Sequence, residues 1–164
     1  FSEIDCPRPL NVYGASKLLM ERLFTQFEKT YPDIMFRIVR YGNVLYSTGS
    51  VLCIWKNLIK QGKEVIVTEP KATRFFWNVE QAIDLIFDCF HNAKDSTPYC
   101  PDMKSMRIDD LLQAMVVKDG DGKEIPIKVI GLQPGENLHE KVLEEGLASN
   151  EVEHFTVEEI MELI

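Results

Sequence analysis

The pattern of apolar and polar positions alternates between helical and strand periods along the chain. Apolar residues three and four positions apart, with charged residues between them, predict five helices. These are expected over about Ala15 to Lys29, Val51 to Gln61, Val79 to Asn92, Ile108 to Val117 and Thr156 to Ile164. Ser105 and Thr156 carry hydroxyls of the kind that cap a helix, and each is expected to cap the helix that follows it, while the loop Ser47–Ser50 is expected to contain the N-cap of the helix that begins at Val51. The inward face of the third helix is expected to comprise Ala82, Ile83, Leu85, Ile86, Cys89 and Phe90.

Shorter apolar runs bounded by turn residues predict strands over Ile34 to Tyr41, Glu64 to Thr68 and Ile125 to Ile130. Because these strands alternate with helices, the pattern predicts an α/β layer architecture. No glycine-rich GxGxxG sequence follows a strand anywhere in the chain. A helix N-terminus that could hold the pyrophosphate of a dinucleotide is therefore not predicted, and such a site would lie on residues outside this sequence.

The composition is that of an ordinary globular domain, with 45% apolar and 27% charged residues over 164 positions. A chain of this length can bury roughly 70% of its unfolded surface, so it needs no metal or disulfide for stability. The net charge of −8 lies entirely after residue 135, where nine acidic residues meet one lysine. An acidic tail repels phosphate polymers, and binding to nucleic acid is therefore disfavoured.

The four cysteines, Cys6, Cys53, Cys89 and Cys100, form no CxxC pair and have no histidine at zinc-ligand spacing. We therefore predict no metal site, and scattered single cysteines indicate a reducing, cytoplasmic location. The sequence has no run of 18 apolar residues that could span a membrane and no signal peptide at its start. It begins at Phe1 rather than at a methionine, which suggests a fragment or a processed chain.

Tyr13 and Lys17 form a YxxxK spacing at the start of the first predicted helix. Residues four apart lie on one helix face, so the phenol and the ammonium group can point at the same place. An ordinary phenol is a poor base at neutral pH, and a nearby lysine cation favours its phenolate form. Such a pair can take a proton from a sugar hydroxyl while hydride leaves for a nicotinamide cofactor. By itself, the spacing is also typical of a packed ring beside a solvated amine.

Five sequence blocks around and after this pair resemble one family in their order and spacing. They are Pro9–Lys17, Arg40–Val44, Ser47–Val51, Thr73–Phe76 and Gln133–Glu140. Together they resemble the inverting UDP-N-acetylglucosamine 4,6-dehydratases and the related capsular polysaccharide (CapD-like) enzymes, which are extended short-chain dehydrogenases/reductases. The resemblance covers nearly the whole chain. It implies an α/β fold, namely the C-terminal part of a Rossmann-like extended short-chain dehydrogenase with a small α/β substrate-binding region.

The resemblance also implies a domain division and a function. Residues 1–62 would be the C-terminal part of the dinucleotide-binding domain, and residues 63–164 mainly the nucleotide-sugar region, with Val79–Asn92 packing back on the sheet. The implied activity is NADP-dependent modification of a UDP-sugar in surface polysaccharide or glycan biosynthesis. The implied partners are the UDP-sugar and either further copies of the chain, as a homo-oligomer, or a missing N-terminal dinucleotide-binding segment. Without that segment, the isolated chain is expected to be inactive.

The roles known in the family carry over to particular residues of this chain. The implied catalytic residues are Tyr13, Lys17 and Asp5, and the implied NADP contacts are Tyr13, Lys17, Tyr41 and Asn43. The implied substrate contacts are Asn43, Ser50, Val51, Arg74 and Glu136. Arg74 would pair with the diphosphate, whose geometry suits a guanidinium group. Plainer interpretations remain, with Arg74 as a strand-edge charge, His139 as a surface or capping residue, and Trp55 and Trp77 as core residues.

The chain departs from the family just before Tyr13. The family carries Ser-Thr-Asp-Lys at this point, and its Asp and Lys serve as acid and base in removing water. Counted without gaps, Ile4 matches the aspartate, and an isoleucine cannot move a proton. A slip of one residue would place Asp5 at the aspartate and Cys6 at the lysine.

Two further departures lie near the implied diphosphate site. Gln133 and Asn137 stand where the family has an arginine and a lysine, which removes positive charge and should weaken binding. Three functions are therefore left open. They are a dehydratase subunit, a non-catalytic nucleotide-sugar-binding or assembly module derived from that enzyme, and an epimerase or reductase on the same scaffold that needs only Tyr13 and Lys17.

Overall fold

The computed structural model describes residues 12–143 and 145–164. Its helices are α1 (Val12–Thr30), α2 (Val51–Lys60), α3 (Val79–Asn92), α4 (Ile108–Asp119) and α5 (Val157–Leu163). Its strands are β1 (Ile38–Val39), β2 (Asn43–Val44), β3 (Val65–Val67), β4 (Thr73–Trp77), β5 (Pro98–Tyr99), β6 (Ser105–Arg107) and β7 (Ile127–Val129). The predicted α/β class is confirmed, and the strands form three small sheets rather than one large sheet.

The three sheets connect segments that lie far apart in the sequence. β1 pairs in parallel with β5, and β3 pairs in parallel with β7. β4 is the centre of the third sheet, with β2 parallel on one side and β6 antiparallel on the other. Because β4 is central, β2 and the residues that follow it lie beside β4. The candidate site is built where these two strands meet.

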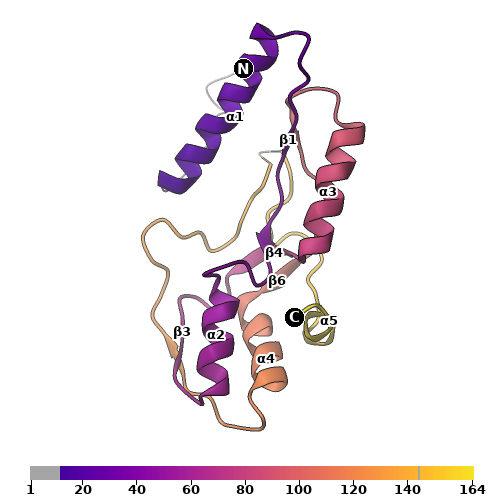
Figure 1. Cartoon of the computed structure of the whole chain (residues 1–164). Helices are drawn as coiled ribbons and strands as arrows, with labels where there is room; N and C mark the ends of the chain where they lie inside the picture. The colour runs from indigo at the N-terminus through magenta and orange to yellow at the C-terminus, as the bar shows by residue number, and fades with distance from the viewer. Residues whose placement is uncertain (1–11, 144) are drawn as a thin grey trace.

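The main hydrophobic core lies between α2, α4, α5 and the strands β3, β4 and β6 (Figure 1). Leu52, Trp55 and Ile59 face it from α2 at helical spacing, and each is almost fully buried. Val65 and Val67 face it from β3, whereas Ile66 between them is exposed, as the two-residue period of a strand requires. This core therefore contains elements from before and after residue 62, and the division at that residue remains a prediction.

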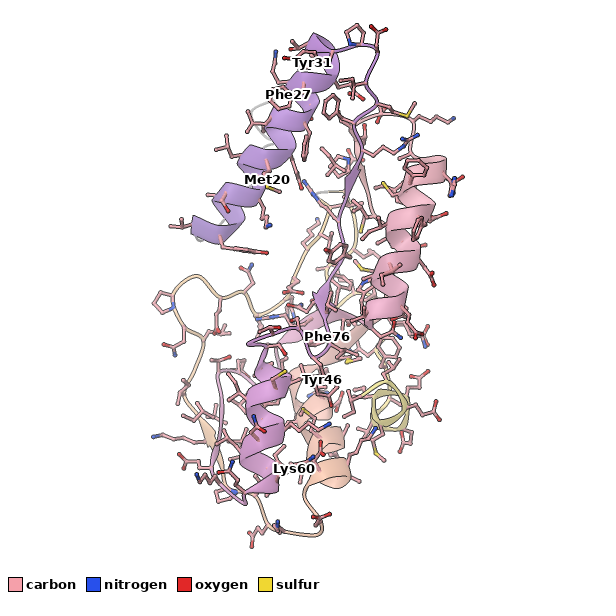
Figure 2. All side chains as sticks on the ribbon, in the orientation of Figure 1. Met20, Phe27, Tyr31, Tyr46, Lys60 and Phe76 are labelled. Atoms are coloured by element: carbon pink, nitrogen blue, oxygen red, sulfur yellow. The ribbon has the colours of Figure 1, made fainter. Side chains whose placement is uncertain are left out.

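A second group of elements lies above this core, where Figure 1 shows β1 between α1 and α3. α3 packs on β1 and buries Ala82, Leu85 and Cys89, whose thiol contacts the Ile38 carbonyl oxygen at 3.8 Å. By contrast, no residue of α1 is buried, although the structure describes the whole helix. Figure 2 shows Met20 and Phe27 along α1 and Tyr31 just after its end, away from Tyr46 and Phe76 in the lower part of the molecule.

Polar contacts attach α1 to the rest of the chain. The guanidinium of Arg40 donates to both carboxylate oxygens of Glu21 at 2.8 and 2.5 Å. Ser96 donates to the Glu28 carboxylate from its backbone N–H at 2.9 Å and from its hydroxyl at 2.6 Å. Phe36 adds aromatic contacts to two rings of the helix. The apolar side chains of α1 are thus left without a packed layer over them in the described part of the chain.

Several local predictions are confirmed. α3 has the predicted bounds, and α2 ends within one residue of the prediction. Thr156 caps α5, because its hydroxyl accepts from the Glu159 N–H while the Glu159 carboxylate accepts from the Thr156 N–H. Trp55 is a core residue, as expected, and its indole N–H donates to the Ile66 carbonyl at 3.2 Å.

Other local predictions are wrong. The run Ile34 to Tyr41 contributes only Ile38–Val39 as a strand, since only these two residues pair with β5. Ser105 does not cap α4, because it lies in β6 and its hydroxyl donates to the Ser149 carbonyl at 2.5 Å. By contrast, the loop before α2 does contain the N-cap residue, Ser50, as expected, although the Ser50 side chain makes no cap hydrogen bond.

On α3, the inward face is narrower than predicted. Ile83, Ile86 and Phe90 are 46%, 46% and 60% exposed, because the two-residue strand β1 covers only one stripe of the helix. The described part of the chain contains no helix long and apolar enough to cross a membrane. Nor do its side chains include a group of three or more His, Cys, Asp or Glu residues that could hold a metal ion.

Candidate functional site

Two neighbouring cavities lie where β2 runs beside β4. The first has a volume of about 420 Å³, and the second about 520 Å³. The first is lined by Asn43, Val44, Ser47, Ser50, Val51, Leu52, Trp55, Ile66, Val67, Thr68, Ala72, Arg74, Phe76, Ile108 and Glu136. The second is lined by Tyr13, Tyr41, Gly42, Asn43, Val44, Ser47, Asn137, Glu140, Lys141 and Val142. Asn43, Val44 and Ser47 line both cavities and form the junction between them.

The first cavity collects all five residues that the family resemblance implies for the substrate. Asn43 comes from β2, Arg74 from β4, Ser50 and Val51 from the start of α2, and Glu136 from the loop after β7. The wall behind these polar groups is apolar. It is formed by the core side chains Leu52, Trp55, Val67 and Phe76, which are at most 7% exposed. A concave site with an apolar wall and a few convergent polar groups is typical of small-molecule binding.

Gly42 allows β2 and β4 to approach as closely as they do. A Cβ atom at this position would lie 2.4 Å from the Phe75 carbonyl oxygen and 2.6 Å from the Phe75 Cβ. The next residue, Asn43, then reaches across β4, and its Nδ2 donates to that same Phe75 carbonyl at 3.0 Å. The absence of a side chain at residue 42 is therefore a condition for the position of Asn43.

Arg74 holds the loop of residues 137–140 against β4. Its Nη1 donates to the carbonyls of Thr73 at 2.8 Å and Leu138 at 3.1 Å, and its Nη2 donates to the Asn137 carbonyl at 2.6 Å. Its Nε lies 3.5 Å from a carboxylate oxygen of Glu140. Most of the guanidinium hydrogens are thus used within the protein, and Arg74 is more than a strand-edge charge.

Glu140 sits between the side chains of Asn43 and Arg74. Its two carboxylate oxygens lie 3.3 and 3.1 Å from Asn43 Nδ2, and it also accepts from the Phe75 backbone N–H at 3.2 Å. Burial raises the pKa of the Glu140 carboxyl above its ordinary value, while the Arg74 guanidinium and the hydrogen bonds from Asn43 and Phe75 oppose that rise. The carboxylate is therefore a partly desolvated acceptor in the wall of the second cavity.

A buried hydroxyl network supports this wall from below. Thr73 Oγ1 lies 2.8 Å from His139 Nδ1 and 2.6 Å from Ser149 Oγ. The Glu140 backbone N–H donates to Ser149 Oγ, and the Ser149 N–H donates to the Glu140 carbonyl, each at 2.8 Å. Thr73 is 2% exposed and Ser149 fully buried, so these bonds fix the chain at residues 139 and 140. His139 is therefore a partly buried member of this hydrogen-bond network.

Tyr13 and Lys17 lie together on α1, as their spacing predicts. Lys17 Nζ is 5.3 Å from the centre of the Tyr13 ring. Tyr13 also lines the second cavity with Tyr41 and Asn43, although its side chain is 71% exposed. Three of the four residues implied for the NADP contact therefore share one cavity wall, and Lys17 lies beside one of them. Asp5, the third residue implied for catalysis, lies outside the described residues.

Glu140 and Thr73 belong to the family blocks, but the resemblance assigned them no role. Ser149 was not singled out at all. A glutamate after a proline-glycine turn and a serine in an acidic tail carry no local signal of burial. Their place becomes clear only once β4 pairs with β2 and the loop after β7 lies across it. The family blocks themselves were the one available hint for Glu140.

The sequence profile of the polysaccharide biosynthesis protein family matches residues 5–162 of this chain. The chain is 33% identical over 153 residues to an inverting UDP-N-acetylglucosamine 4,6-dehydratase of Campylobacter jejuni, a match that covers 92% of the chain and 42% of the relative. It is 36% identical over 137 residues to the capsular polysaccharide biosynthesis protein CapD of Staphylococcus aureus, which covers 82% of the chain and 23% of the relative. The chain thus spans less than half the length of these curated relatives.

Solved structures show the same fold. The structure of Pen from Bacillus thuringiensis superposes with a TM-score of 0.84 at 28% identity, covering 94% of this chain and 57% of that one. A UDP-glucose 4-epimerase from Thermotoga maritima with UDP-glucose and a dTDP-glucose 4,6-dehydratase from Bacillus anthracis with NAD have TM-scores of 0.67 and 0.71. Their identities of 19% and 16% restrict these last two likenesses to the fold.

The chain thus shares its fold with solved structures of a nucleotide-sugar epimerase and a nucleotide-sugar dehydratase. The profile match over residues 5–162 identifies the family. The chain belongs to the polysaccharide biosynthesis protein family, and its curated relatives include a nucleotide-sugar dehydratase.

Proposed function

We propose that this chain provides the nucleotide-sugar site of an NADP-dependent enzyme that modifies UDP-N-acetylglucosamine or a closely related UDP-sugar for surface polysaccharide or glycan biosynthesis. One observation carries the proposal. Five residues from four separate segments, which family resemblance alone assigned to the substrate, line a single cavity of about 420 Å³. They are Asn43, Ser50, Val51, Arg74 and Glu136. Residues chosen at random along the chain would not be expected to meet in this way.

The two cavities suggest which part of the ligand would occupy each of them. The apolar wall of the first cavity suits a nucleoside, and Arg74 supplies the positive charge near a diphosphate. The sugar would then cross the junction at Asn43 and face Tyr13 in the second cavity. Gln133 and Asn137 are uncharged and stand where the family has an arginine and a lysine. Arg74 would therefore carry more of the interaction with the diphosphate than the matching arginine of the family does.

The residues around the second cavity fit part of a nicotinamide cofactor. Tyr13, Lys17, Tyr41 and Asn43 would hold its nicotinamide and ribose end, and the bound cofactor would supply hydride acceptance and return. The chain's own contribution is proton transfer. Tyr13 would take the proton of a sugar hydroxyl, and Lys17, 5.3 Å from the ring, would stabilise the phenolate electrostatically. Asp5 remains the candidate for a second proton-transfer group.

A second candidate function is a nucleotide-sugar-binding or assembly module without catalysis. The sequence before Tyr13 favours it, because Ile4 stands where the family's aspartate is expected. An epimerase or reductase that needs only Tyr13 and Lys17 is the third. All three share the binding site, and they differ only in the chemistry at the second cavity.

The exposed apolar side of α1 is a surface on which a further partner could pack. Leu19 and Leu23 are 61% and 45% exposed on a helix with no buried residue. We propose that this side packs against a dinucleotide-binding segment or against another copy of the chain. We also propose a cytoplasmic location, a proposal that the free thiols of Cys53, Cys89 and Cys100 support.

Calorimetric titration of the isolated chain tests the proposal. We expect saturable binding of UDP-N-acetylglucosamine with a Kd on the order of 0.1 mM and weaker binding of UDP. ADP, whose purine the site is not proposed to recognise, is the control and should give no saturable heat. NADP is expected to give none either, and no water should be lost from the sugar. Absence of saturable UDP-N-acetylglucosamine binding would overturn the proposed function, and NADP-dependent dehydration would overturn the expected inactivity of the isolated chain.

A further inference from the structure

Glu140 lines the second cavity beside Asn43 and is fixed at both its backbone and its side chain. Its backbone exchanges two hydrogen bonds of 2.8 Å with Ser149, a fully buried residue. Its carboxylate accepts from the Phe75 N–H at 3.2 Å and lies 3.5 Å from Arg74 Nε. A side chain held in this way has little freedom, so it can impose an orientation on the groups it contacts.

The group that Glu140 orients is the amide of Asn43. Asn43 Nδ2 carries two hydrogens, and its acceptors are the Phe75 carbonyl at 3.0 Å and the Glu140 carboxylate at 3.1 and 3.3 Å. These acceptors occupy both hydrogens. The remaining polar atom of the side chain is Oδ1, which can only accept a hydrogen bond. Because Asn43 lines both cavities, its free function toward a ligand is that of an acceptor.

We propose that Glu140 is a positioning residue that locks the Asn43 amide with its Nδ2 on the protein, so that Oδ1 is presented as an acceptor to a hydroxyl or N–H group of the sugar. The inference deepens the proposed function and rests on it. The chemistry of the junction is then set by a residue that need not touch the ligand. Arg74 contributes on the other side of the same carboxylate, since it keeps one oxygen of Glu140 engaged.

Glu140→Gln is the variant that tests this role, because it keeps the size of the side chain. The carboxylate of Glu140 accepts from three donors, whereas a glutamine has one acceptor oxygen and an NH2 group. One of the three donors, on Phe75, Asn43 or Arg74, would therefore face the NH2 group of the glutamine, which is itself a donor. Of the three donors, the Asn43 amide is the one that can turn about its own side-chain bond so that Oδ1 accepts from the glutamine, and in turning it gives up its hydrogen bond to the Phe75 carbonyl. Asn43 would then present a donor to the sugar where it previously presented an acceptor.

The measurement is the ratio of the Kd of UDP to the Kd of UDP-N-acetylglucosamine for the 164-residue chain. We expect this ratio to fall about tenfold in Glu140→Gln, with the Kd of UDP changed less than about twofold. Glu124→Gln is the matched control, since it removes the same charge at an exposed position that lines neither cavity. Its ratio should equal that of the unchanged chain.

A second measurement needs no ligand. The side-chain amide signals of Asn43 in ¹⁵N-correlated NMR spectra should shift in Glu140→Gln and stay in place in Glu124→Gln. Unchanged Asn43 signals, or equal weakening of UDP and UDP-N-acetylglucosamine, would overturn the inference and leave the proposed function standing. If the wild-type chain binds neither UDP nor UDP-N-acetylglucosamine, the proposed function fails. The proposed role of Glu140 in recognising the sugar then fails with it. The NMR result still decides whether Glu140 holds Asn43.

Discussion

Gly42→Ala is expected to lower the free energy of unfolding by about 2–3 kcal/mol, which corresponds to a fall in Tm of roughly 5–10 °C for a chain of this size. The added methyl group would lie 2.4 Å from the Phe75 carbonyl oxygen, a backbone atom that cannot move without breaking β4. The strain would push β2 away from β4 and displace Asn43. UDP-N-acetylglucosamine binding should therefore be lost together with stability.

Gly122→Ala separates this steric effect from the general cost of replacing a glycine. Gly122 has a φ of +73°, but a Cβ there would meet nothing within 4 Å. Its substitution is expected to cost about 1 kcal/mol through backbone strain alone and to leave binding unchanged. Thermal unfolding followed by circular dichroism measures both variants. Equal losses in the two would contradict the close approach of β2 and β4.

Arg74→Ala is expected to weaken UDP-N-acetylglucosamine binding by at least about 30-fold, because it removes the positive charge proposed for the diphosphate and releases the loop of residues 137–140. The variant leaves three carbonyls without their donor and the Glu140 carboxylate without its cation. Arg74 and Glu140 side chains are 16% and 30% exposed, so the stability cost should be about 2 kcal/mol, below that of a fully buried pair.

Two comparisons make this second prediction specific. Arg107→Ala removes an arginine whose partner Asp110 is 4.0 Å away at the surface, and it should change stability by less than about 0.5 kcal/mol. Arg74→Lys keeps the charge but cannot bond three carbonyls at once, so it should restore little of the binding. Calorimetry and thermal unfolding are the measurements. Full binding by Arg74→Lys would show that the positive charge alone matters for binding. The hydrogen bonds from Arg74 to the loop of residues 137–140 would then be unimportant for it.

The helices of this fold could be predicted from the sequence because their signals are local. Thr156 begins α5 with a reciprocal hydrogen-bond pair, and the apolar spacing of α2 matches its buried face. The short strands could not be predicted in the same way. β2 and β6 have two and three residues each, and they are strands only because β4 lies between them.

The candidate site was predictable to the extent that family blocks marked its residues. The blocks named Arg74 and Asn43, but they could not show that most of the Arg74 donors bond backbone carbonyls. Glu140 was missed because its role depends on contacts with residues more than sixty positions away. Likewise, Ile86 has the spacing of a core residue yet is exposed. The sequence of a helix does not determine how much of its apolar face another element covers.

Mapping where UDP-N-acetylglucosamine binds tests the proposed nucleotide-sugar site most directly. Backbone and side-chain chemical-shift changes in ¹⁵N-correlated NMR spectra, recorded as UDP-N-acetylglucosamine is added, report this residue by residue. We expect the largest changes at Asn43, Ser50, Val51, Arg74 and Glu136, with smaller changes at Tyr13 and Tyr41. Largest changes around the separate cavity lined by Cys100, Met103 and Leu147 would contradict it.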